Sequence, residues 1–138
     1  MMALKLKKGI KQLLEEAAAR TRGITAAEAE VRLDDSQTVF VDIRDVRELE
    51  RDGMIPGAFH APRGMLEFWV DPDSPYYKPV FAEDMTYVLY CAADWRAVLA
   101  AAALADMGLE NVLHLEGGFS EWKKAGRPVG AREHKHKA

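Results

Sequence analysis

Cysteine is almost absent from this chain of 138 residues, which contains a single one, Cys91. A single thiol excludes an internal disulfide bond and any zinc site built on several cysteines, and it fits a reducing compartment. No apolar run is long enough to span a membrane. The N-terminus has lysines but lacks the apolar block and small-residue cleavage site of a secretory signal. We therefore expect a cytoplasmic protein without a membrane partner.

An excess of charge of one sign is also missing. The chain has 19 Lys and Arg residues and 22 Asp and Glu residues, which are interspersed and give a net charge of −3. A nucleic-acid-binding domain usually presents a basic face, so this composition predicts no nucleic-acid partner. Apolar residues make up 49% of the chain, which predicts one globular domain with a substantial core.

Histidine is scarce, with 4 residues in the chain. His134 and His136 lie in a charged tail, residues 131–138, where their spacing could bind a metal weakly. A solvated C-terminus explains them more simply. His60 and His114 fall in short β-type segments, and neither has a carboxylate at a spacing that would make it an obvious general base. We expect both to be satisfied core or edge residues.

The first 24 residues carry an apolar stripe with helical spacing. The stripe predicts an amphipathic helix over about residues 4–20, ahead of a main domain at 25–130. Glu15 and Glu16 disfavour an organelle-targeting segment, because such segments contain few acidic residues. We expect the helix to dock on the domain, and the sequence leaves open whether it also binds a partner or a second copy of the chain. The stripe consists of Leu6, Ile10, Leu13, Leu14 and Ala17.

Residues 25–130 alternate between β-type and helical patterns. Such alternation predicts an α/β fold with a central, mostly parallel sheet and helices on both faces. Thr25 and Asp45 are predicted N-caps of two helices, and Glu28 has the capping-box position of the first. The strands are expected at 38–43, 86–90 and 111–115, and the helices at 26–33, 46–51, 65–69, 96–107 and 119–125.

Cys91 lies where an apolar strand passes into an Ala- and Leu-rich helix. The first N–H groups of a helix have no intrahelical acceptor and form its positive end, so a thiolate is stabilised there. Arg96 keeps its charge and offers a planar set of donors to an oxyanion. Together these features indicate a group-transfer site for sulfur, phosphate or an arsenic oxyanion. The alternative is that Cys91 is a small apolar residue closing a buried strand.

Several short motifs follow one another from about Thr25 to Pro128. They are Val41-Asp-Ile-Arg-Asp45 with Glu48, Ile55-Pro-Gly-Ala58 leading to Ala61-Pro62, Cys91-x4-Arg96, and Leu115-Glu-Gly-Gly118 followed by Trp122 and Gly126. In this order and spacing, the chain resembles the single-domain members of the rhodanese family of sulfurtransferases. The resemblance implies a rhodanese-like α/β sandwich. It also implies an enzyme that takes sulfane sulfur from a donor such as thiosulfate and passes it to cyanide or a thiol.

The resemblance implies roles for the cysteine and the loop that follows it. Cys91 would be the catalytic nucleophile and would carry the sulfur as a persulfide. The backbone N–H groups of the loop would hold that persulfide, and Arg96 would orient the anionic group of the donor. The implied partners are a small anionic sulfur donor or a protein persulfide, and a thiophilic acceptor. No metal or organic cofactor is implied. The substrate-binding residues would be Ala92, Ala93, Asp94, Trp95, Arg96 and Ala97.

The length of the loop bears on the transferred group. Phosphatases and arsenate reductases of related fold resemble a Cys-x5-Arg loop, which fits a larger tetrahedral oxyanion. In this chain four residues separate Cys91 from Arg96. The shorter loop favours sulfur transfer over phosphoryl transfer.

Other residues of the motifs have structural interpretations. Asp42 and Arg44 end a strand, and we expect them to form an ion pair that braces neighbouring loops. Trp122 is expected to pack in the core under the last helix. Trp95 lies in the loop itself, and an exposed tryptophan there would shield the site or contact a partner.

Two loop residues depart from the family pattern. Asp94 stands where many rhodaneses with a similar loop have glycine, and Ala97 stands where they have serine. Aspartate tolerates the left-handed backbone that glycine permits, so the loop can still close. Its charge, however, would repel a thiolate about 6 Å away by roughly 1.4 kcal/mol at an effective dielectric of about 40. These departures keep a second hypothesis open, in which the chain is a weakly active or non-catalytic rhodanese module that carries sulfur or binds a partner.

The departure at Asp94 leads to a first prediction. We expect weak thiosulfate:cyanide activity, because the carboxylate opposes both the thiolate and a dianionic donor. The Asp94→Gly variant should be more active, by at most about tenfold. Steady-state assays of both proteins test this, and equal or higher activity in the unmodified protein would contradict it.

Overall fold

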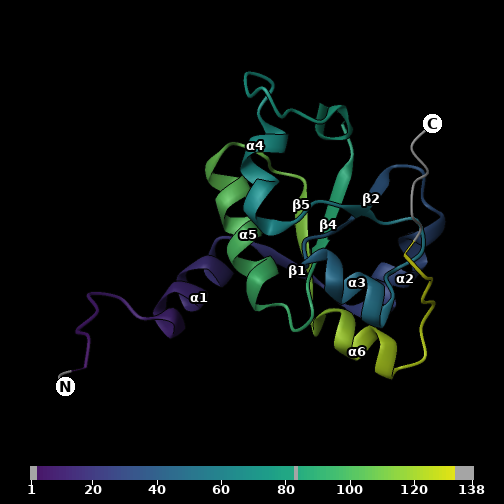
Figure 1. Cartoon of the computed structure of the whole chain (residues 1–138), viewed down its shortest axis with the longest axis horizontal. Coiled ribbons are helices and arrows are strands. Elements are labelled where there is room, and N and C mark those ends of the chain that lie inside the picture. Colours follow the sequence, from purple (N-terminus) through teal and green to yellow (C-terminus); the bar gives the residue numbers. More distant parts are fainter. Residues whose placement is uncertain (1–2, 83, 133–138) are drawn as a thin grey trace.

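A sheet of parallel strands organises the part of the chain that the computed structural model describes, residues 3–82 and 84–132 (Figure 1). Within these residues five strands pair in the order β1-β5-β4-β2-β3, and every ladder is parallel. The predicted metal-binding spacing of His134 and His136 lies outside the described residues. The strands are β1 (Arg22–Ile24), β2 (Thr38–Asp42), β3 (Phe59–His60), β4 (Thr86–Tyr90) and β5 (Val112–Leu115).

Helices cover both faces of this sheet, which confirms the predicted fold class. Figure 1 shows α4 and α5 on one side, α2, α3 and α6 on the other, and α1 beside α5. None of the helices in the described residues is long and apolar enough to cross a membrane. The helices are α1 (Ile10–Ala19), α2 (Ala26–Val31), α3 (Val46–Asp52), α4 (Leu66–Val70), α5 (Trp95–Asp106) and α6 (Gly118–Lys124).

Two helix starts follow from their predicted caps. The Thr25 hydroxyl accepts a hydrogen bond from the backbone N–H of Glu28, and the Glu28 carboxylate accepts one from the N–H of Thr25. Asp45 and Glu48 form the same reciprocal arrangement at the start of α3. Each pair satisfies backbone donors that would otherwise lack an acceptor, so the sequence determines where these helices begin.

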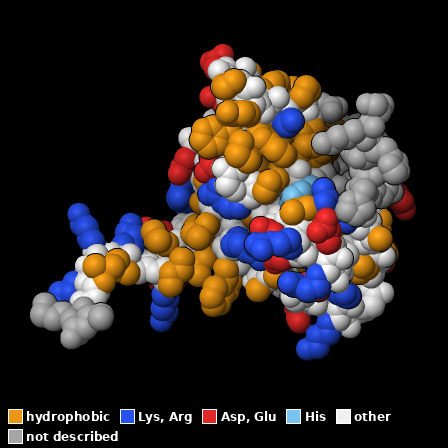
Figure 2. Space-filling view, in the orientation of Figure 1, with side chains coloured by type: hydrophobic (Ala, Val, Ile, Leu, Met, Phe, Trp, Pro, Cys, Tyr) orange, Lys and Arg blue, Asp and Glu red, His pale blue; other side chains and the backbone are white. Residues whose placement is uncertain are grey.

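The N-terminal segment differs from its prediction in two ways. The helix begins at Ile10 rather than near residue 4, with Gly9 as its N-cap. Strand β1 was missed, because its sequence Arg-Gly-Ile has no apolar alternation and its pairing with β5 is a contact between distant residues. Only part of the apolar stripe is buried, where Ala17 and Leu14 pack on α5. Figure 2 shows apolar and basic side chains exposed together on the projecting remainder, which includes Leu6, Ile10 and Leu13.

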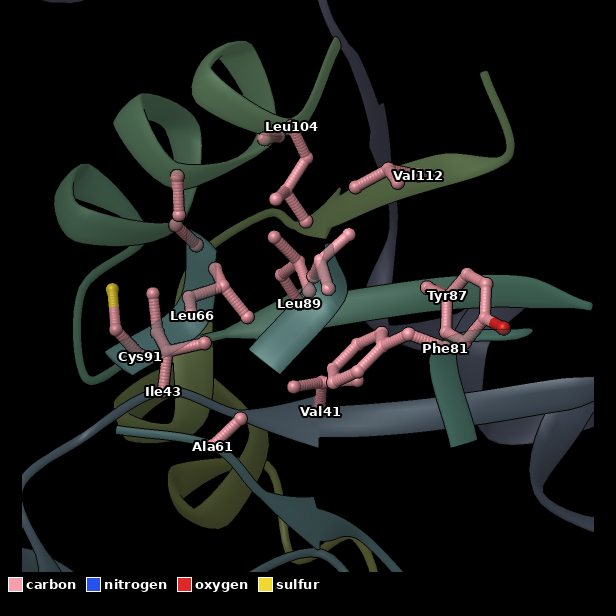
Figure 3. Close-up of a cluster of buried hydrophobic side chains, with 14 residues drawn as sticks. Val41, Ile43, Ala61, Leu66, Phe81, Tyr87, Leu89, Cys91, Leu104 and Val112 are labelled. Carbon is pink, nitrogen blue, oxygen red and sulfur yellow. The ribbon is translucent and has the colours of Figure 1, made fainter. Parts of the chain in front are cut away.

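Successive residues of the central strands point to opposite faces and build two cores. Val41 and Leu89 join the cluster under α4 and α5 that Figure 3 shows. Their neighbours Phe40 and Val88 join a second cluster under α2 and α6. Trp122 is fully buried in that second cluster, where its indole N–H donates to the carbonyl of Pro128 at 2.7 Å, as its predicted core position requires.

Asp42 and Arg44 form the predicted ion pair at the carboxyl end of β2. The Arg44 Nε and Nη2 atoms donate to the two carboxylate oxygens at 3.0 and 2.7 Å, and both residues are almost fully buried. Nη2 also donates to the carbonyl of Gly53 at 2.7 Å, and the guanidinium lies 4.3 Å from the Phe119 ring centroid. The pair thus ties the end of β2 to the end of α3 and the start of α6.

Breaking this pair should destabilise the fold strongly. We expect Arg44→Met to lower the free energy of unfolding by about 3–5 kcal/mol, because Asp42 would keep a buried charge without its partner. Urea denaturation measures the loss. Arg47→Met is the matched control, since the Arg47 side chain is 84% exposed in its ion pair with Asp45 and its removal should leave the midpoint nearly unchanged. Equal midpoints for the two variants would contradict the prediction.

Candidate active site

Cys91 directly follows β4, at the position in the sheet where the strand order reverses. The chain leaves β2 toward β3 at one edge and leaves β4 toward β5 in the other direction. Between two such strands the connecting loops diverge, and a crevice opens at their carboxyl ends. The backbone N–H of Ile43 donates to the Tyr90 carbonyl at 3.0 Å, so the chain after β2 lies beside the residue that precedes Cys91. Cys91 is 1% exposed, and Figure 3 shows its sulfur inside the bend that leads to α5.

The start of α6 holds the Cys91 loop from outside. The backbone N–H groups of Phe119 and Ser120 donate to the carbonyls of Cys91 and Ala92 at 2.8 and 3.0 Å. These carbonyls therefore face α6. The N–H groups of residues 92–97 donate to no acceptor within 3–82 and 84–132. Backbone N–H groups without a protein acceptor are one requirement of the predicted anion cradle.

Asp94 has the left-handed backbone predicted for it. With φ of 73°, it is the only residue other than glycine with a positive φ in the part of the chain that the structure describes. Its carboxylate oxygens lie 3.0 and 2.9 Å from Nδ1 of His114 in β5. His114 is thus a satisfied, buried histidine, as expected, but its carboxylate partner could not be read from the sequence because the two residues are 20 positions apart. His60 is satisfied as expected, with Nε2 at 2.7 Å from the Arg44 carbonyl.

Arg96 has a carboxylate partner within the chain. Its two terminal nitrogens donate to the two carboxylate oxygens of Glu48 at 2.9 and 3.0 Å. The Arg96 guanidinium holds the pKa of Glu48 below its usual range. The Glu48 carboxylate in turn raises the pKa of Arg96, and the Cys91 sulfur acts in the same direction. An incoming anion must therefore share Arg96 with Glu48.

The remaining residues of the predicted site lie in the same loop and the first turn of α5. Trp95 is 67% exposed, as expected for a loop tryptophan. Ala92 is half-buried, Ala93 is exposed, and Ala97 is fully buried beside Cys91 in the core under α5.

Sequence analysis missed the pairing roles of Glu48 and His114. Glu48 stood in a motif, but its contact with Arg96 spans 48 positions and has no local signal. Among the described residues, no group of three or more His, Cys, Asp or Glu side chains could hold a metal ion.

Gly118 allows α6 to approach the loop, and its replacement tests how tightly the loop is held. A Cβ at Gly118 would lie 2.5 Å from the Ala92 carbonyl oxygen, and the residue has φ of 62°. We expect Gly118→Ala to cost about 3 kcal/mol or more of unfolding free energy, from the left-handed backbone and the clash together. Gly126→Ala is the control, since Gly126 has φ of 76° with nothing within 4 Å of its Cβ position. It should lose only about 1–2 kcal/mol. Equal losses in urea denaturation would show that the close approach is unimportant.

Comparison with known proteins agrees with this geometry. The model of the rhodanese-like domain family matches residues 25–125. A sulfurtransferase of Allochromatium vinosum is 34% identical over 74% of this chain and 88% of its own length. The relatives also include the tRNA uridine(34) hydroxylase of Erwinia tasmaniensis, 34% identical over 78% of this chain, but this chain spans only 30% of that protein.

Two solved structures share the fold over nearly the whole chain. A Rhodopseudomonas palustris protein of unknown function, described as a possible tyrosine phosphatase, has a TM-score of 0.90 and 50% identity, covering 94% of this chain and 99% of its own. A homodimeric polysulfide-sulfur transferase of Wolinella succinogenes has a TM-score of 0.67 and 26% identity, covering 92% of this chain and 90% of its own. With the family match over residues 25–125, these likenesses show that this chain belongs to the rhodanese-like family.

Proposed function

We propose that this chain is a sulfurtransferase that carries sulfane sulfur as a persulfide on Cys91. The observation that supports it best is the loop of residues 92–97, whose backbone N–H groups have no acceptor among the described residues and which follows a cysteine at the carboxyl end of the central strand β4. A sulfurtransferase among the relatives supports sulfur transfer in general. We further propose that the protein works in the reducing cytoplasm, where a single thiol such as Cys91 stays free.

The reaction has two nucleophilic steps. The Cys91 thiolate attacks the outer sulfur of thiosulfate, the sulfur–sulfur bond of the donor breaks, and sulfite leaves with the electron pair. An acceptor thiolate or cyanide then attacks the outer sulfur of the persulfide, and Cys91 returns as a thiolate. The loop N–H groups stabilise the sulfur anion in both steps without reorganisation. Arg96 orients the anionic group of the donor, in competition with Glu48.

Phosphoryl transfer is the competing chemistry, because one solved relative is described as a possible tyrosine phosphatase. Two observations favour sulfur transfer in this chain. Four residues separate Cys91 from Arg96, one fewer than in the phosphatase-type loop. The loop also contains the carboxylate of Asp94, which disfavours dianions, phosphate and thiosulfate alike, relative to a persulfide donor of lower charge.

A rhodanese module without turnover of small donors is the second candidate. Asp94 and Ala97 favour it, since the first adds a charge to the loop and the second lacks a hydroxyl donor. In that case a protein persulfide would be the donor, and the module would carry its sulfur for a partner. The tRNA hydroxylases among the relatives are longer proteins of which this chain matches 30%.

Mass spectrometry of the intact protein after incubation with thiosulfate tests the proposal. We expect a gain of one sulfur atom that a reducing agent removes. The Cys91→Ser variant should show no gain, because the chain has no other cysteine. Sulfur uptake from a persulfide but not from thiosulfate would support the carrier module. No uptake from thiosulfate, polysulfide or a persulfide, combined with hydrolysis of an aryl phosphate, would overturn sulfur transfer in favour of phosphoryl transfer.

A further inference from the structure

The buried pair of Asp94 and His114 has no role in the two steps of sulfur transfer. The Asp94 side chain is 15% exposed and that of His114 is 9% exposed, and both carboxylate oxygens lie within hydrogen-bond distance of Nδ1. Buried polar groups that lie this close compensate each other's desolvation. The pair connects β5 directly to the turn that follows Cys91.

Asp94 occupies the N-cap position of α5 but does not cap that helix. An aspartate at this position usually accepts hydrogen bonds from the N–H groups of the first turn. Asp45 does so at the start of α3, where its carboxylate accepts from the backbone N–H of Arg47 at 2.8 Å. Asp94 makes no side-chain cap hydrogen bond. Its carboxylate therefore leaves the N–H groups of the first turn uncapped. Under the proposed function, these same N–H groups bind the sulfur anion.

The position of His114 is set by backbone pairing on both sides. In the sheet register His114 is opposite Leu89 of β4 and Gly23 of β1. A ring that extends from a strand paired on both edges has a well-defined place, and His114 is only 7% exposed. The imidazole can therefore hold the Asp94 carboxylate at a fixed distance from the loop.

We propose that His114 is a positioning residue of this site, which keeps the Asp94 carboxylate away from the N–H groups at the start of α5 and offsets part of its charge through a hydrogen bond. The inference rests on the proposed function, because it explains how a loop that contains a carboxylate can accept an anionic sulfur donor. Without His114, the carboxylate would compete with the donor for the same N–H groups.

The test compares two alkylating reagents of different charge at the single cysteine. The reagents are negatively charged iodoacetate and neutral iodoacetamide, and the ratio of their rate constants at Cys91 reports the charge around the sulfur. We expect His114→Gln to lower this ratio by up to about tenfold, because the carboxylate would then be free to approach the N–H groups and repel the negative reagent. In an Asp94→Gly background, the same substitution should leave the ratio unchanged, because no carboxylate remains to be offset.

Several outcomes would overturn the inference. They are an unchanged ratio in His114→Gln, an equal fall in both backgrounds, and no reaction of native Cys91 with either reagent. His60→Gln is the control and should leave the ratio unchanged, since His60 forms a hydrogen bond with a backbone carbonyl near the site but not with Asp94.

If His114→Gln does not fold, the Asp94→Gly variant decides alone. In that variant, a rise of less than about threefold in the ratio of the iodoacetate to the iodoacetamide rate constant supports the offset. A rise of about tenfold in this ratio contradicts it.

Alkylation does not depend on sulfur transfer, so the two proposals fail separately. A protein that takes up no sulfur but shows the expected ratios would refute the proposed function and support the role of His114. A protein that takes up sulfur equally well from thiosulfate with and without His114, with equal alkylation ratios, would refute the role of His114 alone.

Discussion

Two backbone hydrogen bonds decide which way the Cys91 loop faces. The start of α6 donates to the carbonyls of Cys91 and Ala92, and this directs the acceptors of the loop outward. The donors of the same peptide groups are then left on the other side, away from α6. The arrangement depends on Gly118, because any side chain there would meet those carbonyls. The orientation of the loop therefore depends on a different helix from the one that follows the cysteine.

Each charged side chain of the loop has a partner within the protein. Arg96 is paired with Glu48, and Asp94 is paired with His114. Each pair joins the loop to a separate element, α3 in the first case and β5 in the second. An isolated charge in a partly buried site would be costly, so these partners stabilise the loop as well as setting its potential. The backbone N–H groups remain as the donors without a protein partner among the described residues, which makes them the dominant attraction for an anion.

Local patterns in the sequence were sufficient for most of the fold. The predicted N-caps Thr25 and Asp45 and the apolar strand before Cys91 indicated element type and position, because these signals act between near neighbours. Contacts between distant residues could not be read in this way. Strand β1 exists through its pairing with β5, and the partners of Asp94 and Arg96 lie 20 and 48 positions away. The sequence identified the charge of Asp94 as a difficulty, but only the fold reveals the imidazole beside it.

The burial of the sulfur and the charge balance together bear on the donor under the proposed function. Cys91 is 1% exposed, so the reacting sulfur of the donor must be terminal and narrow. Thiosulfate and a persulfide both meet that condition, but thiosulfate carries more negative charge. Because Arg96 is shared with Glu48, an added negative charge on the donor gains little attraction from it. The carboxylate in the loop repels each added negative charge. Trp95, 67% exposed beside the site, adds apolar surface of the kind that protein partners bind. These features favour a persulfide presented by another protein over free thiosulfate.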